Sequence, residues 1–290
     1  MNYRHIFHAG NICDVVKHAA LTLVLAELCK KTTSFFLLDT HAGAGLYDLE
    51  DSLAGKTNEA ERGIRRLLAA PKIGELAGYY DALASFNREP DGQPPPVAGI
   101  RFYPGSPLLA ASLMRAGDRL IACELLEEDV QNLKRHARRF PNIHVHHRNG
   151  YEAMGAFVPP AEKRGLVLID PPYEDSQEFG SLTQATKSAC RRWPHGVYLI
   201  WYPIKERPAL WRFHEGLVES GLPRLLCAEF LYEEETRHDW LNGCGLIFIN
   251  PPWQLDEKLR TVFSALHGAL GAVQQGNDIR WLAGGNNAET

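Results

Sequence analysis

The chain has 290 residues, of which 45% are apolar and 23% are charged, and its formal net charge is −4. These values fit a globular protein of enzyme size and exclude a disordered acidic tail, a collagen-like repeat and a disulfide miniprotein. The mild negative charge argues against a generally basic nucleic-acid binder but is compatible with a local basic patch.

The cysteines and the apolar runs indicate the compartment. No two cysteines form a CxxC pair, and most of them lie in apolar segments, as expected of free thiols in a reducing environment. The first residues lack the apolar core of a signal peptide, and the longest apolar run, 19–28, is shorter than the roughly 20 residues that span a bilayer. We therefore expect a cytoplasmic protein that does not enter a membrane.

The first predicted element is a helix that begins after Asn11. Asn11 can cap this helix, Asp14 falls in its first turn, and apolar residues recur at helical spacing as far as Leu23. Seven short apolar runs then predict buried strands separated by helices, at 34–39, 119–124, 143–147, 166–170, 197–201, 225–231 and 245–250. This alternation predicts an α/β fold with a doubly wound, Rossmann-like sheet of seven strands, of which the last runs antiparallel.

Residues 47–100 interrupt the alternation. They contain two predicted helices, 59–68 and 73–86, and a proline-rich loop, whereas the connection between two strands needs only one helix. We therefore expect a helical subdomain at 47–100, inserted into one α/β domain made of residues 1–46 and 101–290. The residues from Gly284 onward are expected to form a loose tail.

Glycines follow the first predicted strand, in the run LDTHAGAG at 38–45. Glycines in a turn from strand to helix let the backbone approach a nucleotide closely. A dinucleotide fingerprint needs a third glycine where this chain has Asp48, so the pattern is nearer the first motif of methyltransferases that bind S-adenosylmethionine. A purely structural glycine turn is the alternative.

Three further sites can face such a cofactor. Glu124 ends a predicted strand, where nucleotide-binding folds place an acidic residue that accepts hydrogen bonds from ribose hydroxyls, commonly about 20 residues after the glycines. The gap here is far longer, and the predicted insertion accounts for the excess. Ser106 can face the cofactor or cap a helix, and Asn149-Gly150 can read an adenine edge or form a plain turn.

The most specific motif is Asp170-Pro171-Pro172-Tyr173, at the end of an apolar strand. The two prolines make a rigid turn, which holds the Asp170 carboxylate and a proline carbonyl as paired acceptors and presents Tyr173 for stacking. This set suits an exocyclic amino group on a planar ring, because the amine lone pair must be localised toward an electrophilic methyl group. The motif therefore predicts amino-group methylation.

Other polar groups receive plainer interpretations. The run NPPW at 250–253 is a near copy of the motif, but an antiparallel strand would place it at the opposite edge of the sheet, so we expect a structural turn. The histidines near the N-terminus match no zinc spacing, and we expect no metal site. Basic residues at 134–139, at 191–192 and in the helix 59–68 would contact RNA phosphates if they shared one surface.

Taken together, these motifs resemble the J-type family of bacterial 23S ribosomal RNA adenine-N6 methyltransferases. The segments YRHIFHAGNICDVVKH, LLDTHAGAG, YPGSP, LVLIDPPYE, YLIWYPI and INPPW carry the resemblance in chain order, nearly from end to end. The resemblance implies a class I S-adenosylmethionine-dependent methyltransferase fold with a small helical insertion. The implied substrate is an adenine of protein-free or early-assembly 23S rRNA, and the implied enzyme is a monomer.

The resemblance also implies roles for single residues. On the substrate side it implies Tyr3, Lys17, Pro171 and Tyr173. The family commonly has Asp where this chain has Asn149, so the contact with the cofactor adenine is expected to change in strength. The implied cofactor residues are His18, His41, Ser106, Glu124, Asn149, Gly150 and Asp170, with Asp170 also the catalytic acceptor for the amine.

Other functional classes stay open at this point. One is a related amino-methyltransferase that acts on DNA or on glutamine in a protein. Another is a non-catalytic RNA-binding or assembly protein with the same fold, and a third is a nicotinamide oxidoreductase. Binding of S-adenosylmethionine or of NAD separates the last two from the enzyme expected here, and methyl labelling of purified substrate pools separates the first.

Overall fold

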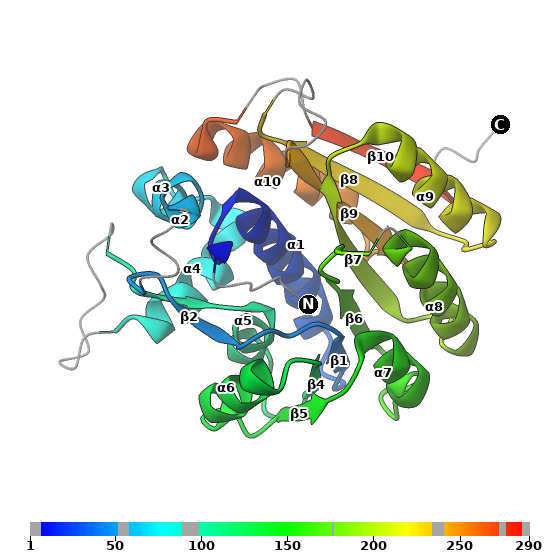
Figure 1. Ribbon diagram of the computed structural model, residues 1–290, viewed down its shortest axis with the longest axis horizontal. Coiled ribbons are helices and arrows are strands. Elements are labelled where there is room, and N and C mark those ends of the chain that lie inside the picture. Colours follow the sequence, from blue (N-terminus) through cyan, green and yellow to red (C-terminus); the bar gives the residue numbers. More distant parts are fainter. Residues whose placement is uncertain are drawn as a thin grey trace.

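The computed structural model describes residues 7–51, 58–88, 99–175, 177–233, 241–272 and 277–285. Within these residues the largest sheet has eight strands in the spatial order β10-β8-β9-β7-β6-β1-β4-β5 (Figure 1). In chain order they are β1 (Phe36–Asp39), β4 (Arg119–Glu124), β5 (Ile143–His147), β6 (Gly165–Ile169), β7 (Val197–Ile204), β8 (Leu225–Leu231), β9 (Gly243–Ile249) and β10 (Asn277–Ala283).

The sheet is parallel on one side and mixed on the other. The neighbours β5-β4-β1-β6-β7 pair in parallel, β9 runs antiparallel to β7 and β8, and β10 runs antiparallel to β8. The predicted α/β class and the antiparallel strand near 245–250 are confirmed, but the predicted count of seven strands is wrong. The missed strand, β10, lies at the sheet edge, where the polar Asp278 and Arg280 alternate with Ile279 and Trp281 and leave no continuous apolar run.

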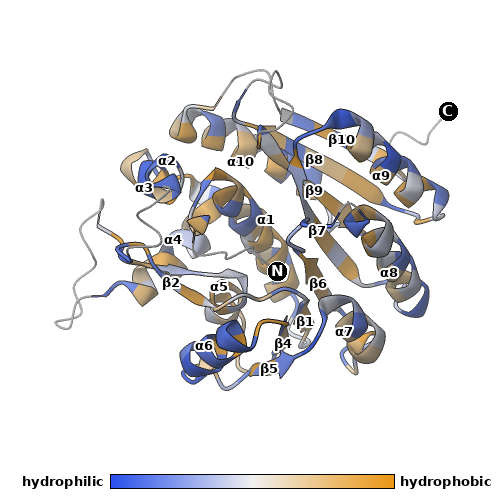
Figure 2. Cartoon of the chain, in the orientation of Figure 1, coloured by the Kyte–Doolittle hydropathy of each residue, from blue (hydrophilic) through white to orange (hydrophobic). Residues whose placement is uncertain are grey.

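Helices cover both faces of the sheet, because successive strand residues point to opposite sides. Leu37 of β1 packs into the core on one face, and Phe36 and Leu38 pack into the core on the other. Figure 2 shows that apolar residues predominate along β8 and β9, between the two helix layers. The first layer contains α1 (Ile12–Cys29), α5 (Ser106–Leu113), α6 (Glu127–Ala137) and α10 (Leu255–Leu270), and the second contains α7 (Gly150–Phe157), α8 (Glu178–Arg192) and α9 (Arg207–Glu219).

Helix α1 carries polar groups into the first layer. Its predicted cap is confirmed, since the Oδ1 atom of Asn11 accepts the backbone N–H of Asp14 at 2.8 Å. Lys17 and His18, in the middle of the helix, are buried. In the part of the chain that the structure describes, no helix is both long and apolar enough to cross a bilayer.

The segment 47–100 begins and ends beside a small two-stranded sheet of β2 (Leu46–Asp48) and β3 (Phe102–Pro104). The predicted helix 59–68 is broken at Gly63 into α2 (Glu59–Arg62) and α3 (Ile64–Ala69), and a 3-10 turn, η3 (Gly74–Leu76), precedes α4 (Ala77–Phe86). Side chains of α3 and α4 join the same core as α1. The division of the chain at 47–100 stays a prediction, and most of the proline-rich loop lies outside the described residues.

The NPPW turn follows β9 at the opposite edge of the sheet from Asp170. Asn250 has a positive φ of 53°, and its amide nitrogen donates to the carbonyl oxygens of Pro194 and Gly196 at 2.8 and 2.9 Å. These carbonyls precede β7, so the turn fixes the amino end of that strand. The turn lies away from the site described below.

Candidate active site

The glycine turn after β1 lies at the carboxyl edge of the parallel strands, where open α/β sheets bind their ligands. Gly43 and Gly45 have positive φ values of 60° and 82°, which a residue with a side chain rarely adopts. The N–H of Gly43 donates to the Oε2 atom of Glu124 at 2.9 Å, and the N–H of Gly105 donates to the carbonyl of Gly45 at 2.8 Å. The turn is therefore tied to β4 on one side and to the start of α5 on the other.

Glu124 is oriented by backbone amides. Its Oε1 atom accepts the N–H groups of Leu125 and Leu126 at 2.6 and 2.8 Å, in addition to the bond from Gly43 to Oε2. Each carboxylate oxygen has two lone-pair sites, so Glu124 keeps acceptor capacity for hydroxyl groups of a ligand.

A first cavity of about 170 Å³ opens between the glycine turn and α7. It brings together six of the seven predicted cofactor residues. The seventh, His18, does not reach it: His18 is fully buried, pairs through Nδ1 with the Tyr103 hydroxyl at 2.8 Å and stacks on that ring at 5.3 Å. The six predicted residues in its wall are His41, Ser106, Glu124, Asn149, Gly150 and Asp170.

Asn149 and Gly150 shape one wall of the first cavity. The Oδ1 atom of Asn149 caps α7 by accepting the N–H groups of Tyr151 and Glu152 at 2.9 and 3.3 Å. A side chain at Gly150 would come within 2.4 Å of the carbonyl oxygen of Thr40, so only glycine lets α7 approach β1 this closely. The predicted turn is thus also a helix start.

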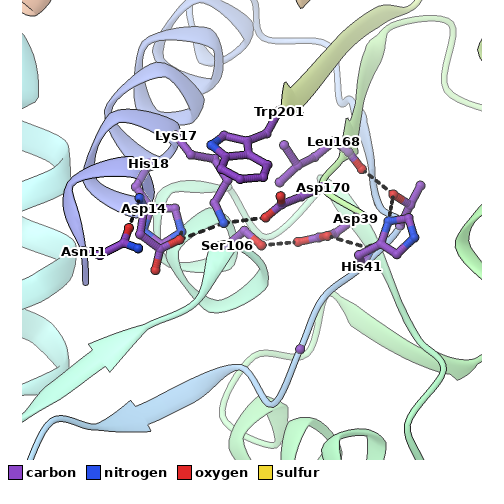
Figure 3. Close-up of polar contacts among 12 residues, drawn as sticks. Asn11, Asp14, Lys17, His18, Asp39, His41, Ser106, Leu168, Asp170 and Trp201 are labelled. Carbon is purple, nitrogen blue, oxygen red and sulfur yellow. Dashed lines mark hydrogen bonds and ion pairs between the residues drawn. The ribbon is translucent and has the colours of Figure 1, made fainter. Parts of the chain in front are cut away.

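Ser106 and His41 contact polar groups at the end of β1. The Ser106 hydroxyl donates to the buried Asp39 at 2.6 Å, while the helix cap itself falls on Gly105, so the predicted cap at Ser106 is wrong by one residue (Figure 3). Burial lowers the pKa of His41 to about 4, which leaves its imidazole neutral near pH 7. Its Nδ1 atom lies 2.8 Å from the Thr40 hydroxyl.

Asp170 follows β6 and is held by an ion pair. The Nζ atom of Lys17 lies 2.5 Å from Oδ2 of Asp170 and 2.7 Å from Oδ1 of Asp14 (Figure 3). Burial opposes the charge of Lys17, but the two carboxylates outweigh it and raise the pKa of the ammonium group well above its usual value. Lys17 is therefore charged, and it fixes one oxygen of Asp170.

A second cavity of about 580 Å³ lies on the other side of Asp170. Its wall includes the predicted substrate residues Lys17, Pro171 and Tyr173, and it shares Lys17, Asp170 and Pro172 with the first cavity. The two cavities therefore meet at the Asp170 carboxylate. Tyr3, the remaining predicted substrate residue, lies outside the described residues.

Aromatic rings line the second cavity near Asp170. Tyr173 has a positive φ of 52°, and its hydroxyl donates to the carbonyl oxygen of Trp201 at 2.6 Å. The rings of Tyr173 and Trp201 lie 5.9 Å apart at 57°, and Trp201 also lines the cavity. The turn thus presents Tyr173 beside a second aromatic side chain.

Three groups of the site lie outside the predicted set. Trp201 lies in the middle of β7, and its signal in the sequence is an aromatic residue on the strand next to the DPPY strand. Asp39 ends β1, directly before the glycine turn, where the glycines alone indicate a ligand. The sequence predicts Asp14 only as a first-turn helix residue, because nothing in it shows that Lys17 and Asp170 meet beside Asp14.

A separate buried cluster has the ligand types of a metal site. Side-chain atoms of His214, Cys227 and Glu229 lie within 4.8 Å of one another, in the only such group found among the described residues. The Tyr202 hydroxyl lies 3.0, 3.4 and 2.9 Å from them, and Arg207 pairs with Glu229 at 2.5 Å. The hydroxyl occupies the centre of the cluster, which is a hydrogen-bonded link between β7, β8 and α9.

The comparisons with known proteins agree with this geometry. The family model described as "Ribosomal RNA large subunit methyltransferase D, RlmJ" matches residues 32–283. Two proteins named "Ribosomal RNA large subunit methyltransferase J" are 34% identical (Escherichia coli K12) and 35% identical (Haemophilus influenzae), each over 97% of this chain and 99% of the relative. The crystal structure of the Legionella pneumophila protein LPL1258 superimposes with a TM-score of 0.85 at 30% identity, covering 96% of this chain and 99% of that one. The chain therefore belongs to the RlmJ family of ribosomal RNA large subunit methyltransferases.

Proposed function

We propose that this protein transfers a methyl group from S-adenosylmethionine to the N6 amino group of an adenine in 23S rRNA, on RNA that is free of protein or in early assembly. The observation that carries the proposal is the meeting of two cavities at Asp170, with a glycine turn on one side and aromatic rings on the other. We also propose that the enzyme acts as a monomer, as the resemblance implies.

The first cavity fits the cofactor by the chemistry of its groups. Glu124 offers oriented acceptors to ribose hydroxyls, and the glycine turn lets a ligand approach the backbone. The neutral His41 and the hydroxyl of Ser106 add polar contacts without repelling a cation. S-adenosylmethionine supplies a methyl group activated on a positively charged sulfur.

The second cavity fits an unstacked adenine. The amine has two hydrogens, and we assign them to the Asp170 carboxylate and to the carbonyl oxygen of Pro171. Tyr173 and Trp201 offer aromatic surfaces to the ring, as proteins that act on splayed-out RNA bases commonly do. His8, Arg62 and Lys205 also line this cavity and supply positive or ionisable groups; His8 pairs with Glu59 and Arg62 with Glu233.

Asp170 orients the amine and can accept a proton from it after methyl transfer. A carboxylate is far too weak a base to deprotonate an aromatic amine before methyl transfer. By accepting a hydrogen bond from the amine, Asp170 localises the nitrogen lone pair toward the first cavity. After transfer the methylated amine is acidic, and its proton passes to Asp170 or to water.

The substrate class is tested by methyl transfer from tritiated S-adenosylmethionine to separate pools of free 23S rRNA, free 16S rRNA, assembled large subunits, DNA and protein. We expect label in free 23S rRNA, with much less in assembled subunits. Label in DNA or protein with none in RNA would contradict the proposal, and so would the absence of S-adenosylmethionine binding in calorimetry.

A further inference from the structure

Two carboxylates share one buried ammonium group in the wall where the cavities meet. Asp14 and Lys17 are each 3% exposed, and Asp170 is 14% exposed at its side chain. Lys17 lies 2.7 Å from Asp14 and 2.5 Å from Asp170, and the second oxygen of Asp14 accepts the N–H of Gly10 at 3.1 Å. The N–H of Gly10, just before α1, therefore fixes the Asp14 carboxylate, and Asp14 fixes the position of Lys17 (Figure 3).

The charges of this group do not cancel. Two carboxylates and one ammonium leave a net charge of about −1 next to the amine site, whereas a simple pair of Lys17 and Asp170 would be neutral. Other titratable or charged groups surround the three on every side. They are Asp39 at the end of β1, His41 after β1, Cys13 and His18 on α1, His8 before α1, Glu59 on α2, Tyr47 on β2, Tyr79 on α4, Tyr103 on β3 and Tyr173 after β6.

We propose that Asp14 is a positioning residue for methyl transfer, which holds Lys17 so that Asp170 is oriented by the ammonium group without being neutralised by it. The inference rests on the function proposed above. It assigns a role to Asp14, which is neither a predicted cofactor residue nor a predicted substrate residue. Asp14 lies in the wall of the second cavity, and its carboxylate pairs with Lys17 at 2.7 Å. We assign its effect to Lys17 and not to a direct contact with the amine.

A net negative charge beside the amine favours methyl transfer because positive charge moves toward the amine during the reaction. The amine nitrogen forms a bond to the methyl carbon as the carbon–sulfur bond breaks, so one positive charge moves from sulfur to nitrogen, and a proton then leaves the nitrogen for Asp170 or water. A net negative group behind the amine stabilises that transfer, and a neutral pair stabilises it less. The net negative charge of Asp14, Lys17 and Asp170 therefore stabilises the transition state more than the bound substrates.

The test compares Asp14→Asn with a matched control, Asp118→Asn. Asp118 is an equally buried carboxylate, which pairs with Arg115 at 2.8 Å and lines neither cavity. For Asp14→Asn we expect kcat per S-adenosylmethionine-binding site to fall about tenfold, with KM for RNA and the cofactor Kd within threefold. In the profile of kcat against pH, the acid limb should move to lower pH, because the negative charge of Asp14 no longer opposes the ionisation of Asp170. Asp118→Asn should lower Tm but leave kcat per site and the pH profile unchanged.

A second measurement needs no turnover. In the free wild-type protein, NMR of 13C-labelled lysine should show a Lys17 pKa above its usual value, and Asp14→Asn should lower it. A Lys17 pKa at its usual value in the wild type would overturn the proposal even if Asp14→Asn fails to fold. So would an Asp14→Asn enzyme with kcat per site within twofold of wild type, or with an unmoved acid limb. If the wild type methylates no RNA, the proposed function fails, while the lysine titration still tests the contact.

Discussion

Asp39 is the clearest case of a single residue whose burial lowers the stability of the fold. It is fully buried at the end of β1, and burial raises its pKa from 3.8 to about 6, although the Ser106 hydroxyl and the charge of Lys17 oppose the rise. A carboxyl group whose pKa is higher in the folded state than in the unfolded state binds its proton more tightly when the protein is folded. Its contribution to stability is therefore fully present below the unfolded pKa, and it is lost as the pH rises through about 6. At neutral pH the ionised Asp39 thus destabilises the cofactor-free fold by about 3 kcal/mol.

Replacing Asp39 with Asn should therefore stabilise the protein. Asn is uncharged and keeps an oxygen for the Ser106 hydroxyl. Thermal unfolding of the cofactor-free protein should show a higher Tm for Asp39→Asn than for wild type at pH 7.5, with the difference shrinking toward pH 4.5. A Tm difference that does not vary with pH would show that Asp39 is not ionised at a cost in the fold.

Asn149 is the residue at which this chain departs from the pattern of the family that it resembles. Its Oδ1 atom is engaged by the α7 cap, so its remaining polar atom is an amide nitrogen, which can only donate. An aspartate at this position would keep the cap and offer a second acceptor to the adenine amine of the cofactor. Calorimetry should show that Asn149→Asp binds S-adenosylmethionine several-fold more tightly, in line with about 1 kcal/mol for one hydrogen bond. Equal affinity would indicate that Asn149 serves only the helix.

At the scale of elements, the contact of α1 with the α2–α3 pair depends on Gly63. A Cβ atom at Gly63 would lie 2.1 Å from the carbonyl oxygen of Gly10, whereas one at Gly74 would meet nothing within 4 Å. The N–H of Ile64 donates to the same carbonyl at 2.8 Å, so α3 begins against the N-terminal side of α1. This close approach explains why one predicted helix is two short helices.

Gly63→Ala should therefore separate α3 from α1, and Gly74→Ala should not. We expect Gly63→Ala to lower the free energy of unfolding by about 2 kcal/mol or more, as overpacking against backbone commonly does. Gly74→Ala should change it by less than about 0.5 kcal/mol. Chemical denaturation of the two variants measures both effects, and equal effects would contradict the packing described for Gly63.

The sequence predicts most strands of the large sheet, but not the elements that depend on contacts between distant segments. The strand bounds at 119–124, 143–147 and 225–231 are reproduced in the structure, and the Asn11 cap is where its side chain indicates. The β2–β3 pair, the edge strand β10 and the break at Gly63 are missed, since each depends on contacts between distant segments. The same holds for the site: motifs place Glu124 and Asp170, and Asp39 lies within the glycine motif, but Asp14 and Trp201 join the site only through packing.

For the whole molecule, the net charge of −4 limits how RNA is held. Binding must come from a few local cations, so the affinity should be modest and should fall steeply with salt. Lys205 is exposed and lines the second cavity, whereas Arg191 is exposed near the end of α8, at the opposite edge of the sheet. Comparing substitutions of these two exposed cations shows whether the RNA backbone passes near the second cavity.

Lys205→Ala should weaken RNA binding and lower the slope of log Kd against log salt by about one, and Arg191→Ala should leave the slope unchanged. Fluorescence anisotropy with labelled 23S rRNA fragments between low and moderate salt measures both. Equal slopes for Lys205→Ala and wild type would place the RNA backbone elsewhere on the surface.

The central claim is that Asp170, where the two cavities meet, directs methylation of an adenine amine. The most direct measurement is nucleoside mass spectrometry of free 23S rRNA after incubation with S-adenosylmethionine and either wild type or Asp170→Ala. We predict N6-methyladenosine with the wild type and none above background with Asp170→Ala, while calorimetry shows cofactor binding by the variant within several-fold of wild type. Methylation of another base by the wild type, or unchanged N6-methyladenosine with Asp170→Ala, would contradict the account.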